Sequence, residues 1–255
     1  MKKNFWIILF IIVLIADIIG IQTGNEALQY IFKPLIVPVL IGYFITATSS
    51  IISKLKKWIV LALIFSWGGD VLLMFQEQKD IFFLLGLSSF LLAHIFYIVF
   101  FHHVRLSEGI KSNIWMLLLV VIYYAVLIAW LSPYLGDMTL PVRIYGVVIS
   151  FMLMLALHML FIKDKPAGRW MIIGALFFVI SDSVLAVNKF YESFELSGLV
   201  IMFTYGFAQL FITEGAMKVF PGFFVIWILP ERIFICFNTF FQFLLLGQHH
   251  SLIII

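Results

Sequence analysis

Two carboxylates stand at hydrocarbon depth in this sequence. Asp70 lies in an apolar segment that begins at Trp58, and Asp182 lies in another that begins near Arg169. An acid at the centre of a membrane helix costs about 2.5–3.5 kcal/mol on insertion scales, so it is retained where it is paired, faces water or reacts. Two acids in one apolar pocket can take different roles in a proton-transfer reaction, because one can stay protonated as the acid while the other stays charged. Alternatively, each acid only completes a local hydrogen-bond network that stabilises packing.

Further polar side chains are predicted to line the same pocket. His94 and Tyr97 are three residues apart on one expected helix, and Tyr205 and Gln209 are four apart on another, so each pair shares a helix face. Ser181 and Asn188 flank Asp182 on its own helix. The candidate lining residues are therefore His94, Tyr97, Ser181, Asn188, Tyr205, Gln209 and Asp17.

Several of these residues also have a purely structural interpretation. A lone histidine such as His94 on a membrane helix often makes one interhelical hydrogen bond and nothing more. Asn188 is near the outer boundary of its segment and fits an interfacial position. Asp17, near the outer end of the first segment, fits a site and an interface equally well. Gly68 and Gly69, just before Asp70, fit close approach of a neighbouring helix.

The sequence predicts that this chemistry needs no metal or cofactor. Cys236 is the single cysteine, so neither an intrachain disulfide nor a cysteine metal site is expected. The histidines show no HxxxH or HxxEH spacing, and no glycine-rich phosphate loop or GxSxG motif occurs. The net charge of +3 comes from loop residues, which indicates membrane orientation rather than nucleic-acid binding.

The elements that must position these side chains are membrane helices. The chain is 64% hydrophobic and 11% charged, whereas a soluble domain carries about 25% charged residues. This composition predicts an all-α, multi-pass membrane helix bundle in one domain over residues 1–218, followed by an apolar tail of uncertain structure over 219–255. A spanning helix needs about 20 apolar residues. Eight such segments are expected: 4–21, 34–52, 58–75, 81–101, 113–132, 140–162, 169–188 and 196–214.

Loop charges predict how the bundle is oriented. Lys and Arg concentrate in alternate connections, as in Lys54, Lys56 and Lys57, whereas each intervening connection holds a single one. Because basic loops remain on the cytoplasmic side, both the N-terminus and the C-terminal end of the bundle are expected inside. We therefore expect an integral protein of the bacterial cytoplasmic membrane. The sequence leaves its oligomeric state open.

A weak internal repeat relates the two halves of the chain. At an offset of 112 residues, Trp58 aligns with Trp170 and Asp70 aligns with Asp182. Four expected helices separate the two copies, so the repeat would be parallel, with helices one to four related to five to eight. The alternative is coincidence within a sequence of biased composition.

Four short motifs carry a family resemblance. They are Phe65-Ser66-x-x-Gly69-Asp70-x-x-Leu73-Met74, Phe90-x-x-Ala93-His94-x-x-Tyr97, Phe178-x-x-Ser181-Asp182-Ser183 and Tyr205-x-x-Ala208-Gln209. Their order and spacing resemble the YhhN family of integral membrane proteins over roughly residues 5–218. That family contains lysoplasmalogenases, which cleave the vinyl ether bond of lysoplasmalogens to a fatty aldehyde and glycerophosphoethanolamine or glycerophosphocholine. The resemblance implies a membrane ether hydrolase that acts on a lysophospholipid and water, with Asp70 and Asp182 as the catalytic residues.

This chemistry agrees with the residues themselves. Vinyl ether hydrolysis begins with protonation of the carbon β to oxygen, and water then adds to the resulting oxocarbenium ion. One acid would donate the proton while the other serves as the base or electrostatic stabiliser, much as in a glycosidase carboxylate pair. The competing interpretation is a proton-coupled carrier or a lipid-binding membrane protein that uses the same intramembrane acids.

Overall fold

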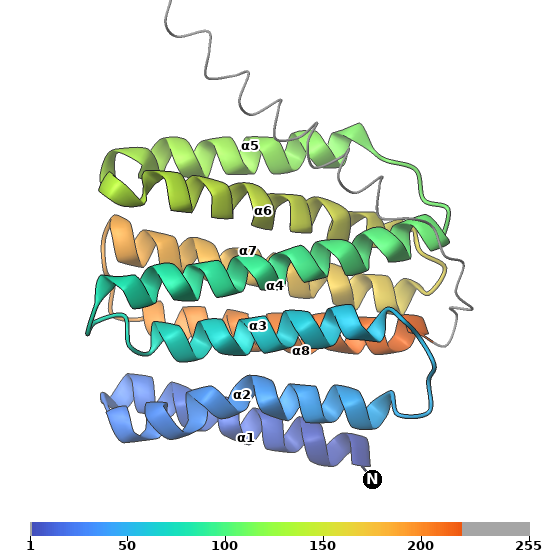
Figure 1. The fold of residues 1–255 in the computed structure, drawn as a ribbon, viewed down its shortest axis with the longest axis horizontal. Helices are drawn as coiled ribbons and strands as arrows, with labels where there is room; N and C mark the ends of the chain where they lie inside the picture. Colours follow the sequence, from blue (N-terminus) through green and yellow to red (C-terminus); the bar gives the residue numbers. More distant parts are fainter. Residues whose placement is uncertain (1, 221–255) are drawn as a thin grey trace, which may run out of the picture. The chain divides into compact units, whose positions relative to one another are not determined.

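The computed structural model describes residues 2–220, which form eight α-helices and three short 3₁₀ turns without any β-strand in that range (Figure 1). Of the predicted tail, residues 221–255 lie outside the described part. The all-α prediction is confirmed. The helices are α1 (Lys2–Thr23), α2 (Glu26–Ala47), α3 (Lys56–Leu73), α4 (Asp80–Ser107), α5 (Ile114–Leu131), α6 (Thr139–Leu157), α7 (Lys165–Phe190) and α8 (Ser197–Val219), with the turns η1 (Ser132–Tyr134), η2 (Gly136–Met138) and η3 (His158–Phe161).

Within residues 2–220, seven of these helices are long and apolar enough to cross a membrane. The remaining one, α3, has 18 residues and includes three charged side chains, Lys56, Lys57 and Asp70. The prediction of a multi-pass membrane helix bundle is confirmed by this architecture.

Helices adjacent in the sequence pack as antiparallel pairs, α1 with α2, α3 with α4, and α7 with α8. The α7–α8 pair is the closest because small residues line it. A Cβ atom added to Gly174 would lie 2.8 Å from the carbonyl oxygen of Ala208, and one added to Gly215 would lie 2.8 Å from that of Ala167. Such close approach is typical of membrane helix interfaces. It places the helix of Asp182 firmly beside that of Tyr205.

The other helices assemble around these pairs. Helix α6 packs against both α4 and α7, while α8 also contacts α1, α2 and α3. Helix α5 is the most peripheral, because only Val120 and Leu131 of its residues are buried. At one end of the bundle, Glu214 of α8 forms an ion pair with Lys3 of α1 at 2.9 Å and accepts a hydrogen bond from Tyr43 of α2. These two contacts tie α1 and α2 to α8.

The largest difference between predicted and observed helix boundaries concerns α2. The sequence predicts a start at Pro34, but the helix begins at Glu26, where the Asn25 side chain accepts a hydrogen bond from the Leu28 amide. Pro34 and Pro38 lie inside the helix. Because Pro38 has no N–H, the Pro34 carbonyl loses its partner within the helix. The indole Nε1–H of Trp67 on α3 donates to that carbonyl instead, at 2.9 Å. This contact between α3 and α2 therefore permits two prolines inside a helix, which local helix propensity disfavours.

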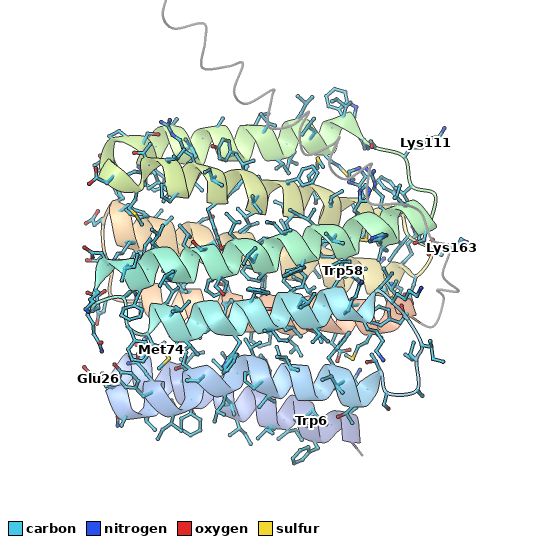
Figure 2. All side chains as sticks on the ribbon, viewed as in Figure 1. Trp6, Glu26, Trp58, Met74, Lys111 and Lys163 are labelled. Atoms are coloured by element: carbon cyan, nitrogen blue, oxygen red, sulfur yellow. The ribbon has the colours of Figure 1, made fainter. Side chains whose placement is uncertain are left out.

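Labelled side chains mark the two ends of the bundle. Figure 2 shows Lys111 and Lys163 at one end and Glu26 at the opposite end. Trp6 and Trp58 lie toward the end that carries the lysines (Figure 2). The two acids of interest lie between these ends, on α3 and α7.

Candidate active site

Asp70 occupies an enclosed position on α3. Its exposed fraction is 4%, and its Oδ2 accepts a hydrogen bond from the Tyr205 hydroxyl of α8 at 2.6 Å. Gly69 lets the ring of Phe90 lie directly against α3, because an added Cβ would meet that ring at 2.5 Å. Asp17 and Asp182 are near enough to interact with Asp70 through their charges. The first acid is thus held by one tyrosine and covered by an aromatic ring.

Asp182 occupies a more open position on α7. Its side chain is 14% exposed. Its Oδ2 accepts a hydrogen bond of 2.5 Å from the Tyr145 hydroxyl of α6, and Nε2 of His94 on α4 lies 3.7 Å from the same oxygen. Its other oxygen, Oδ1, makes no hydrogen bond to any residue within 2–220. The second acid therefore keeps one oxygen available.

The hydrogen bonds of His94 define where its proton lies. Its Nδ1 is 2.7 Å from the carbonyl oxygen of Phe90. A carbonyl oxygen only accepts, so Nδ1 carries the hydrogen and a neutral ring presents the bare lone pair of Nε2. That lone pair faces Oδ2 of Asp182, and two acceptors repel unless a proton lies on one of them. At 3.7 Å, the distance from Nε2 to Oδ2 is too long for a hydrogen bond, and Nε2 has no hydrogen-bond partner within the described residues.

An aromatic ring joins the surroundings of the two acids. The Phe178 ring centroid lies 4.6 Å from that of His94 and 5.6 Å from that of Tyr205, in edge-to-face geometry with both. Phe90 makes a similar contact with Tyr205 at 5.8 Å. Such aromatic pairs are favourable and directional. These ring contacts fix the positions of His94 and Tyr205 relative to one another.

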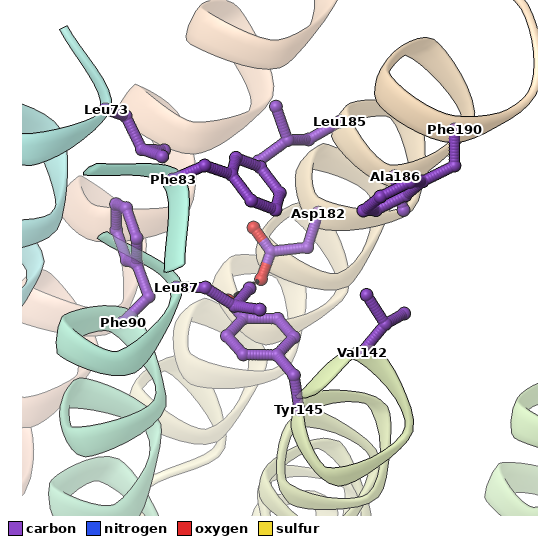
Figure 3. A pocket seen from close by; sticks show the side chains of 10 residues that line it. All are labelled: Leu73, Phe83, Leu87, Phe90, Val142, Tyr145, Asp182, Leu185, Ala186 and Phe190. Carbon is purple, nitrogen blue, oxygen red and sulfur yellow. Dashed lines mark hydrogen bonds between the residues drawn. The ribbon is translucent and has the colours of Figure 1, made fainter. Parts of the chain in front are cut away.

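A first cavity lies between α4, α6 and α7, next to Asp182, with one lining residue from α3 (Figure 3). Its volume is about 40 Å³. Apart from Asp182 and Tyr145 its walls are apolar, and Figure 3 shows the carboxylate pointing into the space between them. Leu87, Leu185 and Phe190 are half-buried, so the rim reaches the surface of the bundle. The lining residues are Leu73, Phe83, Leu87, Phe90, Val142, Tyr145, Asp182, Leu185, Ala186 and Phe190.

A second cavity of about 40 Å³ lies on the other side of Asp182, between α5, α6 and α7. Its wall is mostly apolar, like that of the first, but Tyr123, Ser150 and Ser183 contribute hydroxyl groups to it. Asp182 and Tyr145 border both cavities, whereas Asp70 borders neither. Asp182 is thus the acid that small molecules in either space would contact.

The remaining predicted site residues occupy three kinds of place. The Tyr97 hydroxyl donates to Oε1 of Gln209 at 2.5 Å, and both side chains are fully buried. Ser181 donates to the Ile201 carbonyl at 3.0 Å, joining α7 to α8. The Asn188 side chain accepts from the Phe194 amide at 3.4 Å in the following loop. None of these residues borders either cavity.

Asp17 is fully buried on α1, and neither of its carboxyl oxygens has a hydrogen-bond partner within the described residues. Lys33 of α2 is near enough to interact with both Asp17 and Asp70 through its charge. Asp17 therefore lies behind the first acid, away from the two cavities.

Sequence reasoning missed Tyr145, Tyr123 and Ser150, and it named Phe178 only as part of a motif. Placing a tyrosine or phenylalanine in a membrane helix costs little free energy and is common, so neither residue indicates a functional site as a carboxylate does. Ser183 stands out in the sequence only as part of a motif. No group of three His, Cys, Asp or Glu side chains among residues 2–220 is arranged to hold a metal ion.

These features define a class of protein: a multi-pass helical membrane protein with three aspartates in its interior, Asp17, Asp70 and Asp182, the last of them beside an apolar cavity. The model of the YhhN family matches residues 28–216, which is most of the chain. The chain therefore belongs to the YhhN family, and the resemblance drawn from its four motifs is confirmed.

Named relatives are found in bacteria and mammals. The lysoplasmalogenase of Mycobacterium bovis is 30% identical over 196 residues, which cover 76% of this chain and 72% of the relative. The human lysoplasmalogenase TMEM86B is 35% identical over 161 residues, 62% of each chain, and the human lysoplasmalogenase TMEM86A is 34% identical over 164 residues, 63% of this chain and 65% of the relative. No solved structure gives a significant match.

Proposed function

We propose that this protein is a lysoplasmalogenase, an integral membrane hydrolase that cleaves the vinyl ether bond of lysoplasmalogens. The relatives that carry this name support the activity. The structural observation that carries the proposal is the position of Asp182, at the wall of an apolar cavity, hydrogen-bonded by Tyr145 and facing His94. The products are a fatty aldehyde and a glycerophospho-base. The two-carboxylate mechanism that follows is part of the same proposal.

The reaction needs a proton donor beside an apolar group. The proton adds to the vinyl carbon β to oxygen, and the electrons of the double bond form the new C–H bond. Water attacks the adjacent carbon of the oxocarbenium ion and loses a proton. The hemiacetal then transfers its hydroxyl proton to the glycerol oxygen as that C–O bond breaks. General acid–base groups contribute about 10²–10⁴-fold each to such reactions.

Asp182 is assigned as the general acid. A proton on its carboxyl group would lie beside the first cavity, with Nε2 of His94 3.7 Å from Oδ2. The Tyr145 hydroxyl holds Oδ2, which leaves Oδ1 free to face a reacting group. After protonating the substrate, the same carboxylate can take a proton from the attacking water, as the acid of a retaining glycosidase does in its second step.

Asp70 is assigned as the electrostatic stabiliser of the cation. It borders neither cavity but is close enough to Asp182 for charge interaction. A carboxylate in a water-excluded interior stabilises a developing positive charge more strongly than it would in water. Tyr205 fixes its orientation. The Tyr97–Gln209 bond, Ser181 and Asn188 are proposed to hold this substrate-binding region in register, and Asp17 to add negative charge behind Asp70.

The substrate is proposed to enter from the bilayer. A lysolipid has one chain, and the rim of the first cavity includes half-buried apolar residues at the surface of the bundle. The cavity itself takes only a small part of the lipid, so the chain must extend along the outside of the helices. Lys111 and Lys163 at one end of the bundle support an orientation with the N-terminus and the end of α8 in the cytoplasm. All eight helices, α3 included, are proposed to cross a bacterial cytoplasmic membrane.

The parallel repeat is also retained as a proposal, within a single domain over residues 1–218. Tyr97 and Gln209 are 112 residues apart, which is the repeat offset, and they hydrogen-bond to one another. Residues related by a two-fold axis touch only when they lie at that axis. This contact therefore supports an axis that passes between α4 and α8.

A substrate panel tests the activity. Purified full-length protein in detergent would be supplied with alkenyl lysophosphatidylethanolamine, alkenyl lysophosphatidylcholine and the matching alkyl and acyl lysolipids. Aldehyde release from the two alkenyl lipids alone is the expected result, because only they contain the protonatable double bond. Absence of aldehyde, combined with lipid or proton flux in liposomes, would instead establish the carrier interpretation.

A further inference from the structure

The second cavity contains polar groups that the assignment of the acids leaves unused. Ser150 of α6 is fully buried, borders this cavity, and its hydroxyl has no hydrogen-bond partner within residues 2–220. A buried hydroxyl without a partner is costly, and an internal water is its usual partner. Ser150 therefore indicates that something polar and small occupies this space.

The neighbouring hydroxyls are arranged to receive hydrogen bonds. Ser183 donates its single hydrogen to the Val179 carbonyl at 2.5 Å, and its oxygen lies 2.6 Å from that of Tyr123. Since the Ser183 hydrogen is already used, Tyr123 must be the donor in that second bond. The lone pairs of the Tyr123 oxygen are then open to a further donor. The wall of the cavity thus offers acceptors at Tyr123 and Ser183 and both functions at Ser150.

The size of the cavity matches this arrangement. A water needs about 10–15 Å³ of accessible space and two to four polar partners, and this cavity has about 40 Å³. The first cavity has the same volume but lacks these three hydroxyl groups, which favours hydrocarbon over water there. Asp182 forms part of both walls. Leu131 and Val142 of the second cavity pack with Leu135 of the adjoining loop, which screens it from the end of the bundle.

We propose that the cavity between α5, α6 and α7 holds the nucleophilic water. Tyr123, Ser150 and Ser183 orient this water toward the cationic carbon of the substrate, which lies on the other side of Asp182 in the first cavity. This inference rests on the proposed vinyl ether hydrolysis. The substrate is protonated from the first cavity, and the water attacks from the second. Its oxygen forms the new C–O bond, its proton passes to the Asp182 carboxylate, and no other reactant is needed.

Capture of the cation by methanol tests the origin of the nucleophile. The full-length protein would hydrolyse alkenyl lysophosphatidylcholine in buffer containing methanol, and mass spectrometry would quantify aldehyde and the mixed methyl acetal. If the water is held in the cavity, the wild-type protein forms far less acetal than the bulk methanol-to-water ratio allows. Acetal formed in proportion to that bulk ratio would overturn the proposal, because the nucleophile would then come from solvent.

Variants of the cavity wall complete the test. Tyr123→Phe, Ser150→Ala and Ser183→Ala should each lower kcat roughly two- to tenfold, the effect of one lost hydrogen bond, and should raise the acetal-to-aldehyde ratio by a similar factor. Tyr124→Phe is the matched control, because Tyr124 borders the same cavity but donates to the Arg143 carbonyl at 3.4 Å. A fall in kcat with an unchanged product ratio would show a structural role only and would overturn the proposal. If the wild-type protein releases no aldehyde, the function itself fails.

Discussion

Asp70 and Asp182 stand on helices with equivalent places in the proposed repeat, yet their surroundings differ. Asp70 is enclosed by Tyr205 and Phe90 and borders no cavity. Asp182 has a free oxygen, a histidine at 3.7 Å and a cavity on each side. An enclosed charge acts on a reaction through its field, whereas an accessible carboxyl group can also transfer a proton. The contrast predicts that the two acids are not interchangeable.

The largest effect is expected for Asp182→Asn. The amide cannot donate a proton to carbon or accept one from water, so turnover should fall by about 10³–10⁴-fold. The measurement is aldehyde release by purified protein, with elution volume and thermal melting as controls for folding. Turnover within tenfold of wild type would refute the assignment of Asp182 as the acid.

Asp70→Asn should cost less, about 10²–10³-fold in turnover, because it removes an electrostatic stabiliser while leaving the proton donor intact. The two single variants would be compared in the same detergent with the same alkenyl lysolipid. If the Asp70 variant proves the more damaged of the two, the roles of the acids are reversed.

The tyrosines that hold the acids separate activity from stability. Tyr145→Phe frees the acid that contacts substrate, so kcat should fall about tenfold or more, since a hydrogen bond to a charged group contributes about 1.5–3 kcal/mol. Tyr205→Phe should lower Tm more than Tyr145→Phe does, because no cavity beside Asp70 supplies water as a substitute. Each variant would be measured for both kcat and Tm. Equal losses in both quantities would remove the distinction between the enclosed and the accessible acid.

Gly69→Ala tests how tightly the enclosed acid is covered. The new methyl group would meet the Phe90 ring at 2.5 Å, and that ring also forms part of the first cavity. Overpacking of this kind typically costs about 1–3 kcal/mol, and it should raise KM as the ring moves. Gly68→Ala is the control, since its methyl group would meet only the Ser89 hydroxyl. Indistinguishable KM values for the two variants would contradict this packing.

The smallest effect is expected for Asp17→Asn. Asp17 borders neither cavity, and neither of its oxygens has a partner within the described residues. Turnover should therefore stay within roughly threefold of wild type, because Asp17 does not contact either space where the reacting groups are proposed to lie. A loss as large as that of Asp70→Asn would move Asp17 into the catalytic group.

The sequence predicted the site residues whose burial in a membrane is costly and missed those whose burial is inexpensive. Asp70 and Asp182 stand out because a carboxylate in hydrocarbon needs a reason, and the eight helices stand out because a run of about 20 apolar residues is typical of a membrane span. The hydroxyl groups of Tyr145 and Ser150 are far less costly to bury than a carboxylate, so nothing local distinguishes them from other residues of α6. Their importance depends on which helices pack together, and helix packing is not readable from one segment.

The same limit explains the start of α2. Proline usually marks a helix boundary because it removes a donor and clashes with the preceding turn. Here Trp67 on the next helix supplies the missing donor to the Pro34 carbonyl. The prediction failed because the compensating residue lies 33 positions away in the sequence.

The bond between Trp67 and Pro34 also has a consequence for assembly. In hydrocarbon, each backbone carbonyl without a partner costs several kcal/mol. After synthesis of α2 alone, the Pro34 carbonyl has no donor, and it acquires one only when α3 enters the membrane beside it. The first three helices should therefore become stable as a group. A nascent chain that ends before Trp67 would leave α2 incompletely inserted, and this would be visible as protease access to its proline-containing middle.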